Sequence, residues 1–256
     1  MRVLLTLQYL GTHYGGWQLQ AGVPTVQQVV ENALSQLYHE PIRVHGAGRT
    51  DSGVHAAAQR AHYDAPFAIP TRGLVLGLNQ QLPPDVRILA ADEVADDFHA
   101  RFAAKEKTYE YLIWNHSVAD VFASATHAHV AQKLDVDVMH RAAQELVGTH
   151  DYAVFTVADP EVSSTVRTIS AVAAERRDDQ VILTITADGF LRYQVRRIAG
   201  SLIEIGRGRL NIDALWREAR WTAPAKGLVL RSITYAVPPA TDNRQPTTPS
   251  ANIPPL

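Results

Sequence analysis

The 256-residue sequence contains no cysteine, and this absence excludes disulfides and metal centres held by thiolates. It also has no run of the roughly 18 apolar residues that a membrane-spanning helix requires. The N-terminal segment MRVLLTLQYL is short and alternating, and it lacks the small-residue cleavage site of a signal peptide. We therefore expect a cytoplasmic protein that does not associate with membranes.

The common nucleotide, metal and hydrolase motifs are also missing. GAGRTDSG, residues 46–53, has Asp51 where a dinucleotide fingerprint needs its third glycine, and no G-K-[ST] of a P-loop is present. The eleven histidines include an HAH at 127–129, but no H-E-x-x-H or carboxylate pair at ligand spacing is present. No G-x-S-x-G elbow for a nucleophilic serine exists. We expect neither a metal nor a cofactor.

Lysine is scarce, since four lysines accompany 20 arginines in a chain of formal net charge −2. The total charge does not indicate a nucleic-acid partner, but the distribution of charge matters more than the sum. Residues 192–231 hold nine basic side chains against three acidic ones. Because arginine forks bind phosphate oxygens in pairs, this range predicts a phosphate-binding stripe, with Arg207 and Arg209 as its contacts. The alternative explanation for the excess of arginine over lysine is a genome whose composition favours arginine codons.

Hydrophobic periodicity predicts one supersecondary unit used twice. In the first half we expect two helices, at 25–38 and 71–80, and four strands, at 3–9, 42–46, 54–64 and 86–92. In the second half we expect helices at 135–147, 190–206 and 212–220, and strands at 108–115, 166–176, 181–187 and 228–236. Each half reads β-α-β-β-α-β, the ferredoxin-like order, so the fold class is α+β.

The expected domain division follows from this repeat. Residues 1–105 form the first half and residues 106–237 the second. The tail, residues 238–256, is rich in proline and threonine and is expected to be disordered.

The segment GAGRTDSGVHA, residues 46–56, places one carboxylate, Asp51, in a glycine-bounded turn. One interpretation is an Asx turn, in which the carboxylate accepts hydrogen bonds from the backbone of Ser52 and Gly53. The other is a carboxylate that a guanidinium holds ionised for a substrate. Arg49 is a poor steady partner for that purpose, so an arginine from elsewhere in the chain is expected.

Six segments resemble those of the tRNA pseudouridine synthase A family and occur in its order: YLGTHYGGWQLQ, TVQQVVENAL, GAGRTDSGVHA, FHARFAAKEKTYEYLIWN, GFLRYQVRRIAGSLIEIGRG and APAKGLVL. The resemblance spans roughly residues 3–236. It implies a pseudouridine synthase fold, in which two ferredoxin-like halves join their mainly antiparallel sheets beside a cleft. It also implies cofactor-free isomerisation of uridine at positions 38, 39 and 40 of the tRNA anticodon stem-loop, by a homodimer.

The resemblance also implies site roles. Asp51 matches the essential catalytic aspartate, and Arg196 matches the arginine that pairs with it, with Arg197 as the alternative. Tyr109 matches the tyrosine that lies against the uracil, and Arg49 the arginine that fills the space of the flipped base.

Further substrate contacts are implied for His55 and Leu228. The aspartate is expected to attack the ribose C1′ or the uracil C6, or to deprotonate the ribose C2′, and the sequence does not choose among these. The SSTVRTI segment, residues 163–169, departs from the K-S-P-V-R-T-I segment of the family, so no substrate contact is assigned to it.

A catalytically silent RNA-binding module of the RRM type is the rival hypothesis, but no RNP1-like strand supports it.

Overall fold

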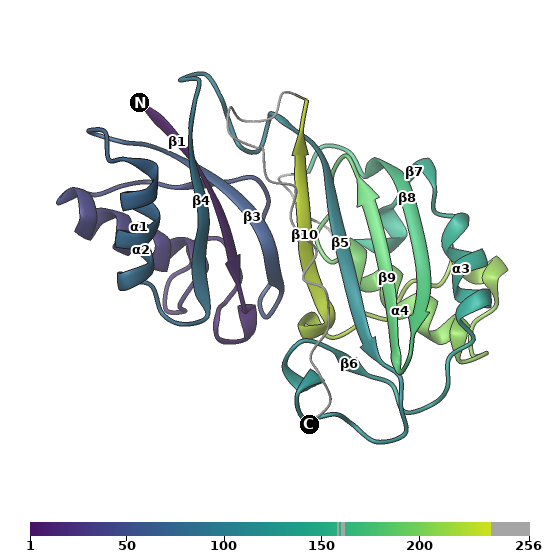
Figure 1. Ribbon diagram of the computed structural model, residues 1–256. Coiled ribbons are helices and arrows are strands. Elements are labelled where there is room, and N and C mark those ends of the chain that lie inside the picture. The colour runs from purple at the N-terminus through teal and green to yellow at the C-terminus, as the bar shows by residue number, and fades with distance from the viewer. Residues whose placement is uncertain (158, 160–161, 237–256) are drawn as a thin grey trace.

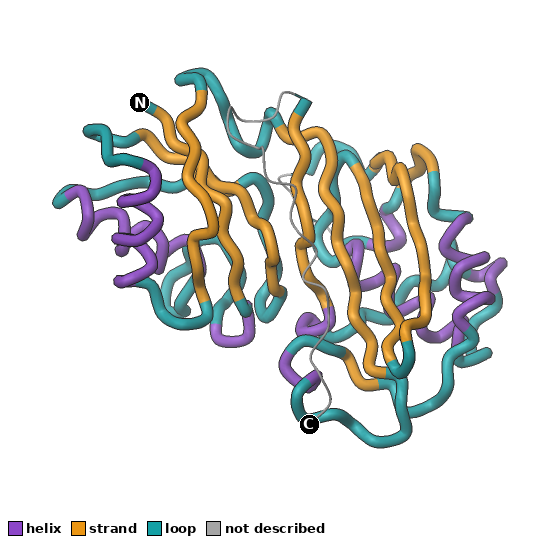
Figure 2. The backbone as a smooth tube through the Cα atoms, in the orientation of Figure 1, coloured by secondary structure: helices purple, strands orange, loops and turns teal. Residues whose placement is uncertain are grey.

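The computed structural model describes residues 1–157, 159 and 162–236. The predicted disorder of 238–256 lies outside the described residues. The described residues form one sheet of ten strands, with β4-β1-β3-β10-β5-β9-β8-β7 as its main path and with β2 beside β3 and β6 beside β5. Figure 2 shows the strands in orange and the helices in purple. Most neighbouring strands are antiparallel, and the pairs β10–β3 and β5–β6 are parallel. The predicted α+β class with a mainly antiparallel sheet is confirmed.

The first half contains four strands in the order β4-β1-β3-β2, which is the ferredoxin-like arrangement. The strands are β1 (Arg2–Tyr9), β2 (His45–Gly46), β3 (His55–Asp64) and β4 (Val86–Val94). The helices α1 (Val26–Tyr38) and α2 (Thr71–Gln81) lie beside them (Figure 1). Only β2 is much shorter than its predicted strand, because the segment from 41 to 44 is not paired with β3.

The second half repeats the arrangement as β10-β5-β9-β8 and adds two short strands. The strands are β5 (Ala104–Trp114), β6 (Ala128–His129), β7 (Gly148–Asp151), β8 (Val166–Arg177), β9 (Gln180–Ala187) and β10 (Leu228–Tyr235). The helices are α3 (Val136–Gln144) and α4 (Gln194–Gly206). The helix predicted at 212–220 is wrong, since only a 3-10 turn at Ile212–Ala214 forms there.

The two halves meet where β10 runs parallel to β3. The contact is short and pairs Val229 with His55 and Leu230 with Ala56. On its other edge β10 pairs with β5 over most of its length. The division near residue 105 stays a proposal, and β5 itself begins at Ala104.

Local sequence explains where the helices begin. Thr25 accepts a hydrogen bond from the backbone N–H of Gln28, and Asp135 accepts one from that of Val138. Both contacts satisfy amides that a helix leaves without a partner in its first turn. Among the described residues, every helix is too short or too polar to cross a bilayer.

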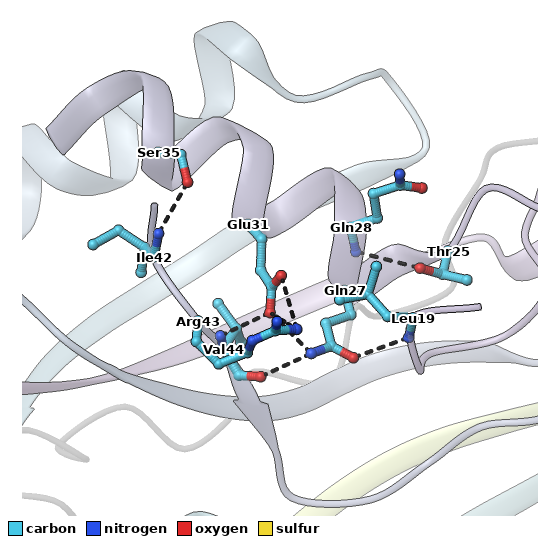
Figure 3. A network of polar contacts seen from close by, with 9 residues as sticks. All are labelled: Leu19, Thr25, Gln27, Gln28, Glu31, Ser35, Ile42, Arg43 and Val44. Carbon is cyan, nitrogen blue, oxygen red and sulfur yellow. Dashed lines mark hydrogen bonds and ion pairs between the residues drawn. The ribbon is translucent and has the colours of Figure 1, made fainter. Parts of the chain in front are cut away.

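Polar side chains of α1 connect the helix to the segment that leads into the loop of Asp51 (Figure 3). The side chain of Gln27 donates to Val44 O at 3.1 Å and accepts from the N–H of Leu19 at 3.0 Å. Glu31 accepts from the N–H of Val44 at 2.9 Å. One helix face therefore fixes two segments that border the cavity described below.

Candidate active site

A cavity of about 910 Å³ lies beside the junction of the two halves. Its lining comes from segments far apart in the sequence, including the loop 48–54, strand β5 and the start of α4. Asp51, Arg196 and Tyr109, which were predicted from separate motifs, all line it. Arg49 and Leu228 line it as well, Arg49 as an exposed side chain and Leu228 as a buried one.

The loop that carries Asp51 is held by the backbone of a neighbouring segment. Thr50 O accepts from the N–H of Trp17 at 3.1 Å, and the hydroxyl groups of Thr50 and Tyr9 are 2.8 Å apart. Gly16 passes so close that an added Cβ would lie 2.5 Å from Thr50 O, and its φ of +101° also favours glycine. The loop is therefore rigid where it presents its carboxylate.

Asp51 faces Arg196. The Nη1 atom of Arg196 lies 3.6 Å from Oδ2 of Asp51, and their side chains are 15% and 25% exposed. Burial raises the pKa of the Asp51 carboxyl, and the charges of Arg196 and Arg192 partly offset that rise. The Asx-turn interpretation fails, because the carboxylate accepts no backbone N–H among the described residues.

Arg197, unlike Arg196, does not face Asp51. Its Nη1 atom donates to the carbonyl oxygens of Thr156 at 2.7 Å and Val154 at 3.4 Å. It does not line the cavity of Asp51. Of the two adjacent arginines, only Arg196 therefore reaches Asp51, and its Nε also donates to Ala223 O at 2.9 Å.

Tyr109 extends from β5 toward the cavity and is 6% exposed. Its ring packs edge-on against Phe190, with the ring centroids 5.2 Å apart. Burial, and then the electrostatic effects of Tyr9 and Asp51, raise the pKa of the Tyr109 hydroxyl far above its ordinary value. The hydroxyl therefore stays protonated at neutral pH.

Tyr193 is a cavity residue that the sequence did not reveal. It has φ +63° immediately before α4, a left-handed conformation that is rare outside glycine. The guanidinium groups of Arg192 and Arg196 lie 5.2 and 5.1 Å from its ring centroid. The predicted helix start at 190 is therefore wrong by one turn, because the chain reverses at Tyr193 and the helix begins at Gln194.

The basic lining of the cavity was missed as a group. It comprises Arg49, Arg101, Lys107, Arg167, Arg192 and Arg196, against the acidic Asp51 and Asp159. These residues belong to five separate segments, so no local count of charge could find them. A chain of net charge −2 thus concentrates positive charge at one place.

Arg207 and Arg209 do not line this cavity. They follow the C-terminal end of α4, roughly 16 Å along the helix from Arg196. Arg207 donates to the carboxylate of buried Glu204, and Arg209 lies 3.8 Å from its other oxygen. The side chain of Arg207 is 24% exposed and that of Arg209 is 62% exposed, so the phosphate contact predicted for the two stays a prediction for the surface outside the cavity.

His55 also differs from its prediction. It is 2% exposed and outside the cavity lining. Its Nδ1 accepts from the N–H of Gly11 at 2.9 Å, and its Nε2 lies 3.1 Å from the carbonyl oxygens of Ala125 and Lys226. Both ring nitrogens are therefore occupied by backbone, and the side chain ties three segments together rather than contacting a substrate.

His55→Ala should therefore lower stability rather than chemistry. We expect a loss of roughly 2–4 kcal/mol in the free energy of unfolding, because buried backbone groups lose their partners. Burial lowers the pKa of His55, so the unfolded chain takes up the proton first and native stability falls as pH drops below the unfolded pKa. Urea denaturation between pH 5 and 7.5 should reveal a smaller acid-side loss in the variant. A wild-type free energy of unfolding in the variant would contradict this assignment.

Sequence comparisons with known proteins agree on one family. Residues 6–103 and 142–236 match the family described as tRNA pseudouridine synthase. A tRNA pseudouridine synthase A of Limosilactobacillus fermentum is 40% identical over 255 residues, covering 94% of this chain and 99% of that protein. One of Acinetobacter baylyi is 42% identical, with 91% and 90% covered. An archaeal box H/ACA sRNP Nop10-Cbf5 complex aligns with a TM-score of 0.37 at 12% identity, over 93% of this chain and 49% of that one.

Proposed function

This chain belongs to the tRNA pseudouridine synthase family, and we propose that its cavity is where a tRNA uridine is isomerised. The enzyme is an isomerase that converts uridine to pseudouridine in the anticodon stem-loop of tRNA. Positions 38, 39 and 40 are the proposed targets. The reaction breaks the bond from ribose C1′ to uracil N1 and forms one to C5. The proton leaves C5 and N1 gains one, so reactant and product have the same composition.

The observation that carries the site assignment is the ion pair of Asp51 and Arg196 beside Tyr109. We assign Asp51 as the catalytic residue, acting at C1′, C6 or C2′. Arg196 keeps it ionised against the effect of burial. Tyr109 stacks on the uracil, and Arg49 takes the place of the flipped base, whose extrusion costs a few kcal/mol. Leu228 supplies an apolar contact at the cavity wall.

The test of this function is tritium release from tRNA that contains [5-³H]uridine. Release requires loss of the C5 hydrogen, so it reports the isomerisation itself. Mapping pseudouridine by carbodiimide treatment and primer extension then identifies the modified positions. We expect release from tRNA with uridine in the 3′ side of the anticodon stem-loop, and none from tRNA that lacks it.

Substitutions of Tyr109 separate stacking from proton transfer. Its hydroxyl makes no hydrogen bond among the described residues, and burial keeps its pKa high. Tyr109→Phe should therefore retain single-turnover rates within about fivefold, whereas Tyr109→Leu should lose roughly 1–3 kcal/mol of stacking. Equal losses in the two variants would instead assign chemistry to the hydroxyl.

Two further features of the enzyme remain proposals. A homodimer, with a basic cleft that spans both subunits, rests on the family resemblance. A cytoplasmic location is supported by the tRNA substrate.

A further inference from the structure

Lys107 lies at the cavity without a partner. It projects from β5, is partly buried and makes no hydrogen bond or ion pair with any residue that the structure describes. Burial, and then the charges of Arg101 and Arg167, lower the pKa of Lys107 to about 8. Burying a cation without a counter-ion costs folding free energy, so its placement does not serve stability.

The groups around Lys107 are mostly cations. Arg101 and Arg167 line the same cavity, and Arg167 is positioned by hydrogen bonds from its Nη1 to the carbonyl oxygens of Ser164 and Val166. Asp188 is the acidic group that acts on Lys107, and its effect is the smallest of the four. Among the described groups that act on Lys107, two guanidinium groups thus outweigh one carboxylate.

The position of Lys107 relates it to the reacting nucleotide. Alternation along β5 puts Lys107 and Tyr109 on one face, roughly 6.8 Å apart along the strand. Lys107 also borders the catalytic loop, since a Cβ added to Gly48 would lie 3.5 Å from its Nζ. Gly48 is three residues before Asp51. The ammonium group therefore lies beside the catalytic loop, on the same strand face as Tyr109.

We propose that Lys107, with Arg101 and Arg167, binds a phosphodiester of the RNA strand next to the flipped uridine. This assignment rests on the proposed function. A lysine ammonium and two guanidinium groups match the charge and the acceptor oxygens of a phosphate. A cavity of about 910 Å³ is far larger than a small anion, which fits a polymer that passes through it. A phosphate contact carries no sequence information, so this site positions the strand.

Binding of an anticodon stem-loop RNA across a salt series tests the proposal. Lys107→Met should raise the dissociation constant about tenfold. It should also reduce the steepness with which log K falls against log salt by about one unit. Lys107→Arg should restore most of both. Lys105→Met is the matched control, because Lys105 lies on the same strand face but is exposed and outside the cavity lining. If Lys107→Met and Lys105→Met have the same affinity and slope, the proposal is overturned.

Chemical labelling provides a test that does not depend on catalysis. The sequence has four lysines, so acetylation at each can be followed by mass spectrometry. Stem-loop RNA should protect Lys107 strongly and inorganic phosphate should protect it weakly, while Lys105 reacts equally in both. Absence of protection by either probe would overturn the anion site. Protection by phosphate in an enzyme that releases no tritium would retain the anion site and refute the proposed function.

The Lys107→Met variant should melt at or above the melting temperature of the wild type, because the substitution removes an uncompensated charge.

Discussion

Asp51→Asn should abolish tritium release, with a loss of about a thousandfold or more in single-turnover rate. The amide keeps the shape of the side chain but cannot act as nucleophile or base. Asp51 is the carboxylate that faces Arg196 in the cavity, and Asp159 is the other acidic residue among the described residues of the lining. Affinity for tRNA should stay within about threefold, because the basic lining that attracts phosphates is unchanged.

The control for Asp51→Asn is its stability. Its Tm should lie within about 3 °C of wild type, which corresponds to roughly 1 kcal/mol for a chain of this size. Asp159→Asn serves as the matched substitution of the second carboxylate in the lining. A rate for Asp51→Asn within tenfold of wild type would refute the catalytic assignment.

Arg196→Met should lower the rate about a hundredfold or more and change its dependence on pH. In the wild type, burial raises the pKa of Asp51 and Arg196 counteracts that effect. Activity requires the carboxylate, so it falls as pH drops through this pKa. Without Arg196 the pKa of Asp51 rises further, and the acidic limb of the pH–rate profile moves to higher pH. The profile should be measured under single-turnover conditions with saturating tRNA.

Arg197→Met is a stringent comparison for this variant. Arg197 is adjacent in sequence, but its guanidinium donates to carbonyl oxygens of Val154 and Thr156 and does not reach Asp51. Loss of the Arg197 side chain should reduce the stability of the fold and leave the acidic limb of the pH–rate profile at the wild-type pH. An identical shift of the limb in both variants would show that Arg196 acts through the fold and not through the carboxylate.

Local signals in the sequence predicted most of the fold. Periodicity predicted a helix at 25–38 and strands at 166–176 and 181–187, and the structure has α1 at Val26–Tyr38, β8 at Val166–Arg177 and β9 at Gln180–Ala187. The helix expected at 212–220 failed because that stretch folds as a 3-10 turn and an irregular segment, which buries Leu215 without helical hydrogen bonding along its length. Periodicity predicts which side chains are buried more reliably than it predicts the secondary structure of the segment that carries them.

Residues of the candidate site were predictable where a recognisable motif contained them, as for Asp51, Tyr109 and Arg196. The loop of Asp51 is contiguous, so its residues were found together. The cations of the cavity are not contiguous, and the dense run of arginines at 192–231 contributes just Arg192 and Arg196 to the lining. Arg207 and Arg209 belong to the same run but pair with Glu204. Charge density along a chain does not determine which face of the fold each side chain occupies.

The short parallel pairing of β10 with β3 has a consequence for biosynthesis. During translation the ribosome releases β1 to β9 before β10, yet β10 occupies the middle of the finished sheet, between β3 and β5. The nascent chain therefore holds the Asp51 loop and the Tyr109 strand on two separate sheets until its last described strand emerges. Only then can Asp51 and Tyr109 line one cavity. We therefore expect the incomplete polypeptide on the ribosome to be inactive toward the abundant tRNA around it.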